Sequence, residues 1–446
     1  MSALRRFKPY PAYKDSGVEW LGEIPAHWEV KPLKHLTAFT TGWTPPSGQE
    51  DLYGGDHLWA NISDLGPRVL MTTDKTISDA AIRVARLQKV NAGSLLFSFK
   101  LSVGTVSIAG VEMFTNEAIA AFAPSPRIDT QYLYWAAPAL VPRNAQENIY
   151  GAPLLNRDRI ANARLISPPS SEQRAIAAFL DRETARIDAL VAKKERLIEL
   201  LQEKRTALIT RAVTKGLDPT VPMKDSGVEW LGEIPAHWEL KRLRHALRAR
   251  PRNGISPPIG VGGDVPTFST AAVNDGEVLI DENIKYTMLE QREAQPFIVA
   301  IGDIFLLRGS GSRDIVGRAG ILKKEPPIGC IYPDILIRVQ PSRLMTPWFL
   351  VNSLNSAAVR FQIESLAQTA SGIWKISGED VRTLAIPVPP YDEQLHIRGE
   401  VSRQIARLDA LVAKVRDAVD RLKELRTALI SAAVTGKIDV REEAAP

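Results

Sequence analysis

Two long stretches of the chain have an apolar pattern that is typical of paired helices. The first extends from Ser170 to about Val213 without a proline or a glycine, and Gly216 follows it. Serine ahead of an acidic residue favours the start of a helix, and glycine beyond the last periodic position favours its end. The pattern therefore predicts a helix of about 40 residues, roughly 60 Å long at 1.5 Å per residue. A second stretch, between Pro389-Pro390 and Gly436, predicts a matching helix.

Both predicted helices carry a heptad row, in which spacings of three and four alternate. In the first helix the row comprises Ile187, Leu190, Leu197, Leu201 and Leu208, with Lys194 and Lys204 between them. In the second helix it comprises Leu408, Leu411, Val415, Ala418, Leu422, Leu425 and Leu429. Lysine stems can lie along such a row while their ammonium groups stay in water. Neither helix could bury its row alone, so we expect the two to pair; the alternative is two ordinary long helices of a bundle.

The chain contains an internal duplication. The sequence KDSGVEWLGEIPAHWE occurs unchanged as Lys14–Glu29 and as Lys224–Glu239, and we call these two copies the boxes. The helices repeat as well, since Arg205-Thr206-Ala207-Leu208-Ile209 returns as Arg426-Thr427-Ala428-Leu429-Ile430. An approximate two-fold axis between the copies would make the helix pair antiparallel, with one globular domain near each end of a rod. Two tryptophans in each box favour packing against a fixed surface, either the chain's own helices or a partner subunit.

The segments between box and helix differ throughout and are predicted to be mixed α/β domains with short strands. Strands are expected at Ser94–Phe99, Glu117–Phe122, Asp303–Leu307 and Ile335–Val339. Each domain ends alike, with a glycine turn, a short helix and a strand that leads into a proline pair. We expect domains at 1–166 and 217–387, and helices within 167–216 and 388–446. The expected fold class is α+β, with two domains separated by an antiparallel coiled coil.

Bulk composition narrows the class of protein. The 446 residues are 45% apolar and 24% charged, and no apolar run approaches the roughly 18 residues that span a bilayer. No apolar segment follows the basic residues near Met1, so we expect no secretory signal, no membrane partner and a cytoplasmic location. The one cysteine, Cys330, excludes an intrachain disulfide. A net charge of +5 permits polyanion binding without requiring it.

Two groups of cations are candidates for contact with nucleic acid. A run without acidic residues contains Arg242, Arg244, Arg248, Arg250 and Arg252, and it suits phosphate contacts. Lys100, Arg308 and Arg313 stand beside small residues directly after predicted strands, where a loop can present them to base edges. The alternatives are a solvated helix face for the run and plain surface turns for the loops.

Catalytic and metal-binding patterns are missing. No GxxxxGK[ST] phosphate loop and no dinucleotide fingerprint occurs. Val388-Pro389-Pro390-Tyr391 is similar to the N-P-P-Y loop of amino-methyltransferases only in part, because valine stands where the asparagine or aspartate is needed. The six histidines form no cluster, so we expect neither a catalytic residue nor a metal ligand.

The duplicated boxes and helices, together with two junctions, resemble the specificity subunit of a type I restriction–modification system. The junctions are Pro168-Pro169-Ser170-Ser171-Glu172-Gln173 and Pro389-Pro390-Tyr391-Asp392-Glu393-Gln394. The resemblance covers essentially the whole chain. It implies two target-recognition domains that each recognise one half of an interrupted, asymmetric site in double-stranded DNA. The helices would then act as a spacer and as the docking surface for other subunits.

The resemblance also implies the partners and cofactors. The partners would be modification subunits, expected as two copies, and restriction subunits. The chain itself would be non-catalytic and free of cofactors, whereas S-adenosylmethionine, ATP and Mg would be bound by the partners. Two competing interpretations are a coiled-coil adaptor that binds proteins and a DNA-modifying enzyme with its own catalytic site.

Overall fold

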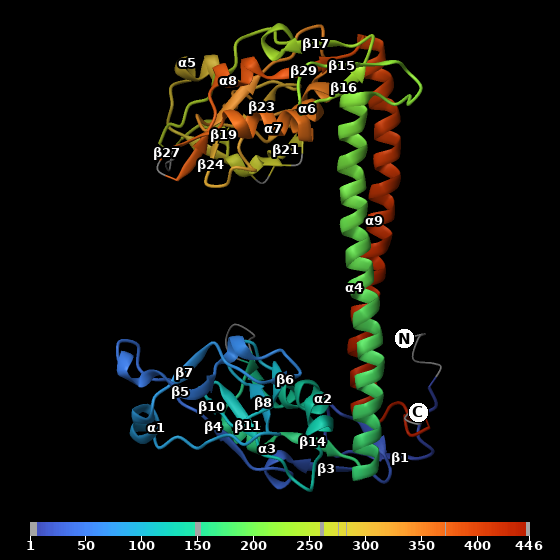
Figure 1. Ribbon diagram of the computed structural model, residues 1–446. Helices are drawn as coiled ribbons and strands as arrows, with labels where there is room; N and C mark the ends of the chain where they lie inside the picture. Colours follow the sequence, from blue (N-terminus) through green and yellow to red (C-terminus); the bar gives the residue numbers. More distant parts are fainter. Residues whose placement is uncertain are drawn as a thin grey trace. The chain divides into compact units, whose positions relative to one another are not determined.

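The computed structural model describes residues 7–147, 153–258, 263–274, 276–281, 283–370 and 372–442 (Figure 1). The chain divides into two compact units, and each is described by itself. Unit 1 comprises Met1–Glu195 and Asp417–Pro446, and unit 2 comprises Arg196–Arg416. Each unit therefore contains one box, one mixed domain and part of both long helices. No helix among the described residues is long and apolar enough to cross a membrane.

Unit 1 is built on a five-stranded sheet. Its strand order is β4 (Phe39–Thr41), β11 (Ile119–Phe122), β8 (Leu95–Ser98), β9 (Val106–Ala109) and β6 (Val69–Leu70), with β6 parallel to β9 and the other pairs antiparallel. Alternate side chains point to opposite faces. Leu95 and Phe97 accordingly pack with helix α2 (Thr130–Leu140), whereas Leu96 joins a separate cluster on the other face. Burial of both faces explains the nearly uninterrupted apolar sequence of the central strands.

Unit 2 repeats this plan on a six-stranded sheet. Its strand order is β18 (Arg252–Asn253), β26 (Leu336–Val339), β23 (Ile304–Leu307), β25 (Ala319–Ile321), β21 (Gly276–Val278) and β20 (Val273–Asn274), and β21 runs parallel to β25. Helix α6 (Pro347–Asn355) covers the face that carries Ile304 and Leu306, as α2 does in unit 1. The strands β26, β23, β25 and β21 thus correspond to β11, β8, β9 and β6, although the two sequences have diverged.

The remaining elements are short. In unit 1 they are β1 (Tyr13–Asp15), β2 (Glu23–Pro25), β3 (Glu29–Pro32), η2 (Leu33–His35), η3 (Glu50–Leu52), β5 (Tyr53–Ala60), η4 (Ile62–Asp64), β7 (Lys75–Ile77), α1 (Asp79–Ala85), β10 (Phe114–Thr115), η5 (Val141–Asn144), β12 (Gln146–Glu147), β13 (Pro153–Leu154), α3 (Arg157–Asn162) and β14 (Arg164–Ser167). In unit 2 they are β15 (Met223–Asp225), β16 (Glu233–Pro235), β17 (Glu239–Arg242), η6 (Leu243–His245), β19 (Val265–Phe268), η7 (Thr270–Ala272), β22 (Ile284–Thr287), α5 (Gln291–Ala294), η8 (Gln295–Phe297), β24 (Gly309–Ser310), α7 (Ala357–Leu366), β27 (Gln368–Ala370), β28 (Ile373–Lys375), α8 (Gly378–Thr383) and β29 (Ala385–Val388).

The four predicted strands are present, and each begins later than predicted; the strand predicted at Ser94–Phe99 also ends one residue earlier. Asp303, for example, lies in a turn before β23, because its carboxylate accepts a hydrogen bond from the Ala300 amide at 3.0 Å. The predicted closing helix and strand occur in both domains: β14 pairs with β3, and β29 pairs with β17. The predicted glycine turn at Gly151 lies outside the described residues.

The long helices are α4 (Ser170–Lys215) and α9 (Tyr391–Val434). In unit 1, Glu195 pairs with Lys423 at 3.3 Å and Asp188 pairs with Arg426 at 3.0 Å. The residue number of the partner on α4 therefore falls as that on α9 rises, so the two segments run antiparallel. In unit 2 the end of α4 packs with the beginning of α9 in one core, which gives the same direction. The expected fold class is confirmed.

The structure covers most of the predicted apolar row but leaves three of its members exposed. Among the predicted seam residues, Ile187, Leu201, Val415 and Leu429 are buried, and Leu208, Leu408, Leu422 and Leu425 are partly buried. Leu190, Leu197 and Leu411, in contrast, are 42%, 40% and 43% exposed. Their neighbours Val191, Ile198 and Val412 are the more shielded residues. On a helix, the residues three and four positions from a buried residue lie on either side of the same apolar stripe. In these helices apolar residues occupy both kinds of position. The packing of each helix against its partner therefore decided which members of the row are covered.

Candidate nucleic-acid interface

A carboxylate at the start of α4 holds the first box. The Oε2 atom of Glu172 accepts hydrogen bonds from Trp28 Nε1 at 2.9 Å and from the Tyr10 hydroxyl at 3.1 Å, and His27 Nε2 lies 2.7 Å from Oε1. Trp28 is fully buried, and the Glu172 side chain is only 9% exposed. Burial and the neighbouring Glu172 charge raise the pKa of Tyr10. The box is thus fixed on the chain's own helix.

The same arrangement recurs in unit 2. Trp238 Nε1 donates to Oε1 of Glu393 at 3.0 Å, and His237 Nε2 lies 2.8 Å from Oε2. Trp238 is fully buried, whereas the Glu393 side chain is 29% exposed. The sequence places both histidines inside the boxes and both glutamates in the repeated junctions. It did not connect the two motifs, which are about 150 residues apart in the chain.

Each box also packs against the end of the other long helix in its unit. Gly436 follows α9 with φ +71°, and a Cβ atom placed there would lie 2.4 Å from Pro25 Cδ and 2.8 Å from Trp28 Cζ3. Gly216 follows α4 with φ +75°, where a Cβ would lie 3.4 Å from Trp238 Cζ2. Glycine is needed at both places for the left-handed backbone. In each unit the box therefore contacts both the start of one long helix and the end of the other.

The glutamine of each junction ties the domain to the same place. Gln173 Oε1 accepts the amide hydrogen of Asp129, which caps α2, at 2.7 Å. Gln394 Oε1 accepts that of Thr346, which caps α6, at 2.8 Å. The pair of junction residues thus has two tasks, because glutamate holds the box and glutamine holds the helix that supports the sheet. We call this arrangement the clamp.

The candidate base-contacting loops occupy equivalent places in the two units. Lys100 follows β8 and precedes β9, whereas Arg308 and Arg313 follow β23 and precede β25. Lys100 is exposed, and the adjacent Leu101 is 91% exposed with φ +56°, which is unusual for a residue other than glycine. Such an apolar tip on a strained turn is uncommon on a surface without a partner.

The loop of unit 2 rests on a small separate sheet. Gly309 pairs with Lys375 in β28, and the Arg313 guanidinium lies 5.0 Å from the centre of the Trp374 ring. Arg313 also donates to the carbonyl of Glu364 at 2.7 Å. Trp374 and the exposed Lys375 were not among the predicted contact residues. Their pattern, a short strand after a glycine turn, was recognised only as a closing motif of the domain.

The cationic run does not join this loop. Arg308 follows the end of β23 that lies beside Leu336, whereas Arg248 bonds to Gln340 beyond the opposite end of β26. Arg242 donates to the carbonyl of Thr383 at 2.6 Å, and Arg244 donates to His245 at 3.1 Å. All five arginines of the run, Arg242, Arg244, Arg248, Arg250 and Arg252, are exposed. They therefore form a surface of their own near the base of the domain.

Arg252, another member of the run, also contacts its own domain. Its guanidinium lies 4.6 Å from the Phe297 ring and donates to the carbonyl of Pro296 at 3.4 Å. The carbonyl of Arg252 accepts from the hydroxyl of buried Tyr332, and burial raises the pKa of Tyr332 to about 12. Among the described residues no group of His, Cys, Asp or Glu could hold a metal ion.

Comparisons with known proteins agree with this architecture. The family model of the type I restriction modification DNA specificity domain matches residues 25–200. The EcoKI type I restriction enzyme specificity subunit of Escherichia coli K12 is 25% identical over 94% of this chain and 90% of its own length. The StySPI specificity subunit of Salmonella potsdam is 23% identical over the same shares.

Solved structures show the same fold. A chain from a structure that describes complex assembly and conformational transition of the type I R-M system matches with a TM-score of 0.67 at 15% identity, covering 92% of this chain and 98% of that one. The HsdS subunit from Thermoanaerobacter tengcongensis matches with a TM-score of 0.50 at 16% identity, covering 93% and 98%.

Fold and clamp together define a duplicated protein in which two mixed domains are carried on a pair of antiparallel helices. The matching domain model and relatives that align over almost their whole length show that the chain is similar to the specificity subunits of type I restriction enzymes. They support neither the adaptor interpretation nor that of a self-contained DNA-modifying enzyme.

Proposed function

We propose that this chain binds double-stranded DNA at a two-part, asymmetric and interrupted site, with one domain on each half. The observation that carries the proposal is the contrast between frame and domains. The boxes are identical and the clamps correspond, whereas the two domains share a strand order but little sequence. Identical domains would favour a palindrome, so divergent domains on a repeated frame favour two different half-sites.

The proposed domains are residues 1–166 and 217–387, with the helices within 167–216 and 388–446 as the spacer. Half-sites on one face of B-DNA lie about 34 Å apart or near a multiple of that distance. A helix pair of roughly 60 Å can accommodate such a separation. The similarity to type I specificity subunits over almost the whole chain supports this division of labour.

Contacts to DNA divide into two groups in this proposal. Lys100, Arg308 and Arg313 lie on equivalent loops and would contact base edges, for which lysine and arginine suit guanine. The exposed run of Arg242, Arg244, Arg248, Arg250 and Arg252 would contact phosphates and position the domain without sequence preference. Affinity should therefore fall with added salt, because phosphate contacts release counterions.

The chain would assemble with two modification subunits and with restriction subunits. Methyl transfer from S-adenosylmethionine and ATP- and Mg-dependent cleavage would reside on those partners, and this chain would hold none of these cofactors. DNA as the ligand favours a location in the cytoplasm.

Methylome mapping tests the proposal. The chain would be co-expressed with its modification subunit in a host without DNA methylation, and methylated adenine would be mapped across the genome. One interrupted, asymmetric motif is the expected result. A soluble, assembled complex that methylates nothing and does not bind duplex DNA would contradict the proposal.

Exchange of one domain tests the division of the site. Replacing residues 240–386 with the corresponding domain of another specificity subunit should change one half of the methylated motif and leave the other half intact, because each domain has its own core. A change in both halves would show that the domains do not act independently.

A further inference from the structure

The two units differ where the domain meets the long helices. In unit 1 this place is filled by a network of aromatic rings and cations. The Arg68 guanidinium lies 3.8 Å from the Tyr134 ring centre and pairs with Asp181 of α4 at 2.9 Å. Trp135 donates from Nε1 to Asp181 at 2.8 Å, and Arg426 of α9 lies 5.8 Å from its ring. The network therefore connects the domain to both helices.

The corresponding positions of unit 2 can be found from two structural landmarks. Asp129 and Thr346 both cap the supporting helix and donate to the junction glutamine, so Trp135 corresponds to Asn352. In the parallel strand pairs, Val69 lies opposite Ile108 and Glu277 lies opposite Ile321, so Val69 and Glu277 are equivalent. The residues that precede them, Arg68 and Gly276, therefore correspond. Unit 2 thus has a short amide and a glycine where unit 1 has an indole and a guanidinium.

These smaller residues leave a cleft in unit 2. Its volume is about 550 Å³, and its lining includes Gly276, Asn352, Asn274 and Asn355. Three arginines line it as well: Arg205 from α4, Arg318 from the connection before β25, and Arg360 from α7. Asp314 is the one acidic residue of the lining.

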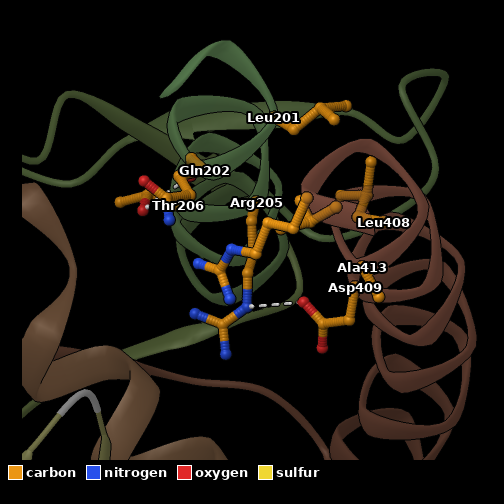
Figure 2. A pocket seen from close by; sticks show the side chains of 9 residues that line it. Leu201, Gln202, Arg205, Thr206, Leu408, Asp409 and Ala413 are labelled. Atoms are coloured by element: carbon orange, nitrogen blue, oxygen red, sulfur yellow. Dashed lines mark hydrogen bonds and ion pairs between the residues drawn. The ribbon is translucent and has the colours of Figure 1, made fainter. Parts of the chain in front are cut away.

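The three arginines differ in how they are held. Arg205 lies 3.8 Å from Asp409 across the helix pair, where Figure 2 shows the two side chains facing one another. Arg360 donates to the carbonyls of Val316 and Asp314, and its side chain is 14% exposed. For Arg318, the described part of the chain offers its guanidinium no hydrogen bond or ion pair, and it is only partly exposed.

Positive charge exceeds negative charge in this cleft. Burial is the main cause that lowers the pKa of Arg360, and the nearby positive charge of Arg318 lowers it further. The negative charges of Glu364 and Asp314 oppose this effect. Arg318 and Arg360 therefore repel one another across the cleft. An anion between them would relieve that repulsion, and asparagine amides could donate further hydrogen bonds to its oxygens.

We propose that this cleft binds a phosphate group of the DNA backbone, next to the bases that the loop of unit 2 contacts. The inference rests on the proposed function. DNA is favoured as the source of the anion because Arg318 and Asp314 belong to the same β23–β25 connection as Arg308 and Arg313. A duplex bound by this loop passes its backbone along the cleft. The corresponding place in unit 1 is filled, so the contact is confined to one half-site.

The test uses the full chain assembled with its modification subunits and a fluorescent duplex that carries the mapped motif. Arg318→Gln is compared with Arg343→Gln, because Arg343 is an exposed arginine of unit 2 outside the cleft and its loss changes the net charge equally. Arg318→Lys preserves the charge. Dissociation constants are measured over a range of salt concentrations, and thermal unfolding confirms that each variant is folded.

Arg318→Gln should weaken binding about threefold to tenfold and reduce the slope of log K against log salt by about 0.9, the value for one phosphate contact. The methylated motif should stay the same, since a phosphate contact has no sequence preference. Arg318→Lys should recover most of the slope, and Arg343→Gln should match the wild type.

Two results would overturn the proposal. One is an affinity and a slope for Arg318→Gln that equal those of Arg343→Gln. The other is impaired assembly with the modification subunits and unchanged DNA binding, which would assign the cleft to an acidic side chain of a partner. Failure of the proposed function itself would be distinct, because the wild-type complex would then neither bind nor methylate the duplex.

Discussion

Units 1 and 2 share a clamp and a strand order, but their domains differ in sequence and in surface. Glu172 and Glu393 bind the corresponding tryptophan and histidine of identical boxes, and the neighbouring glutamines accept the amide hydrogens of the residues that cap helices α2 and α6. The contact of each domain with the helices has diverged, with a filled network in unit 1 and an open polar cleft in unit 2. A repeated frame can thus present two domains with different surfaces at corresponding positions.

The first prediction concerns the clamp, where the largest effects are expected. Trp28→Ala and Trp238→Ala should each lower the free energy of unfolding by about 3–5 kcal/mol, because both rings are fully buried. Urea unfolding, followed by hydrogen exchange in peptides of either unit, would locate the loss in the mutated unit. Trp20→Ala and Trp230→Ala are the matched controls, since these rings are 39% and 43% exposed. Equal effects of buried and exposed tryptophans would contradict the clamp.

The second prediction concerns the burial of the apolar row. Ile187→Ala in unit 1 and Leu201→Ala in unit 2 should each cost about 2 kcal/mol or more, since both side chains are buried. Leu190→Ala and Leu197→Ala should cost less than about 1 kcal/mol, because about two fifths of each residue is already in water. Thermal unfolding of the four variants compares buried with exposed members of the predicted row. A larger loss from Leu190→Ala or Leu197→Ala would contradict this pattern of burial.

The third prediction compares the two glycines that follow the long helices. Gly436→Ala should destabilise its unit by about 2 kcal/mol and Gly216→Ala by about 1 kcal/mol. Both have a left-handed backbone, but only at Gly436 would the new methyl group overlap Pro25 and Trp28. Chemical denaturation measures the difference. If Gly216→Ala proved the more harmful change, the close packing of the first box on Gly436 would be in doubt.

The fourth and smallest effect provides a probe of unit 2 alone. Cys330 is the one cysteine of the chain, and burial raises the pKa of its thiol to about 12. The reactive thiolate is formed only as the pH rises through that value, so at pH 8 the native thiol stays protonated and unreactive. A chromogenic disulfide reagent should label it only after unit 2 opens. Trp238→Ala should accelerate labelling, whereas Trp28→Ala should not.

Much of the frame was accessible from the sequence because repetition supplied an internal standard. The boxes, the junctions and both long helices were recognised from identical residues and from proline and glycine positions. The equivalence of the loops after β8 and β23 was not accessible from the sequence, since the two loops share no identical stretch of residues. It became visible only through the pairing of strands that are distant in the chain.

The sequence by itself determined the duplication, the two long helices, the strand-rich domains and the resemblance to a known family. These follow from local patterns, in which spacing and turn residues fix how neighbouring parts of the chain fold. Tertiary structure alone decided which members of the apolar row are buried, which carboxylate holds each box, and that Asn352 and Gly276 line a cleft where Trp135 and Arg68 fill the corresponding place. Each of these depends on side chains that are more than a hundred residues apart or on the rotation of one helix against another, and local patterns do not encode such relations.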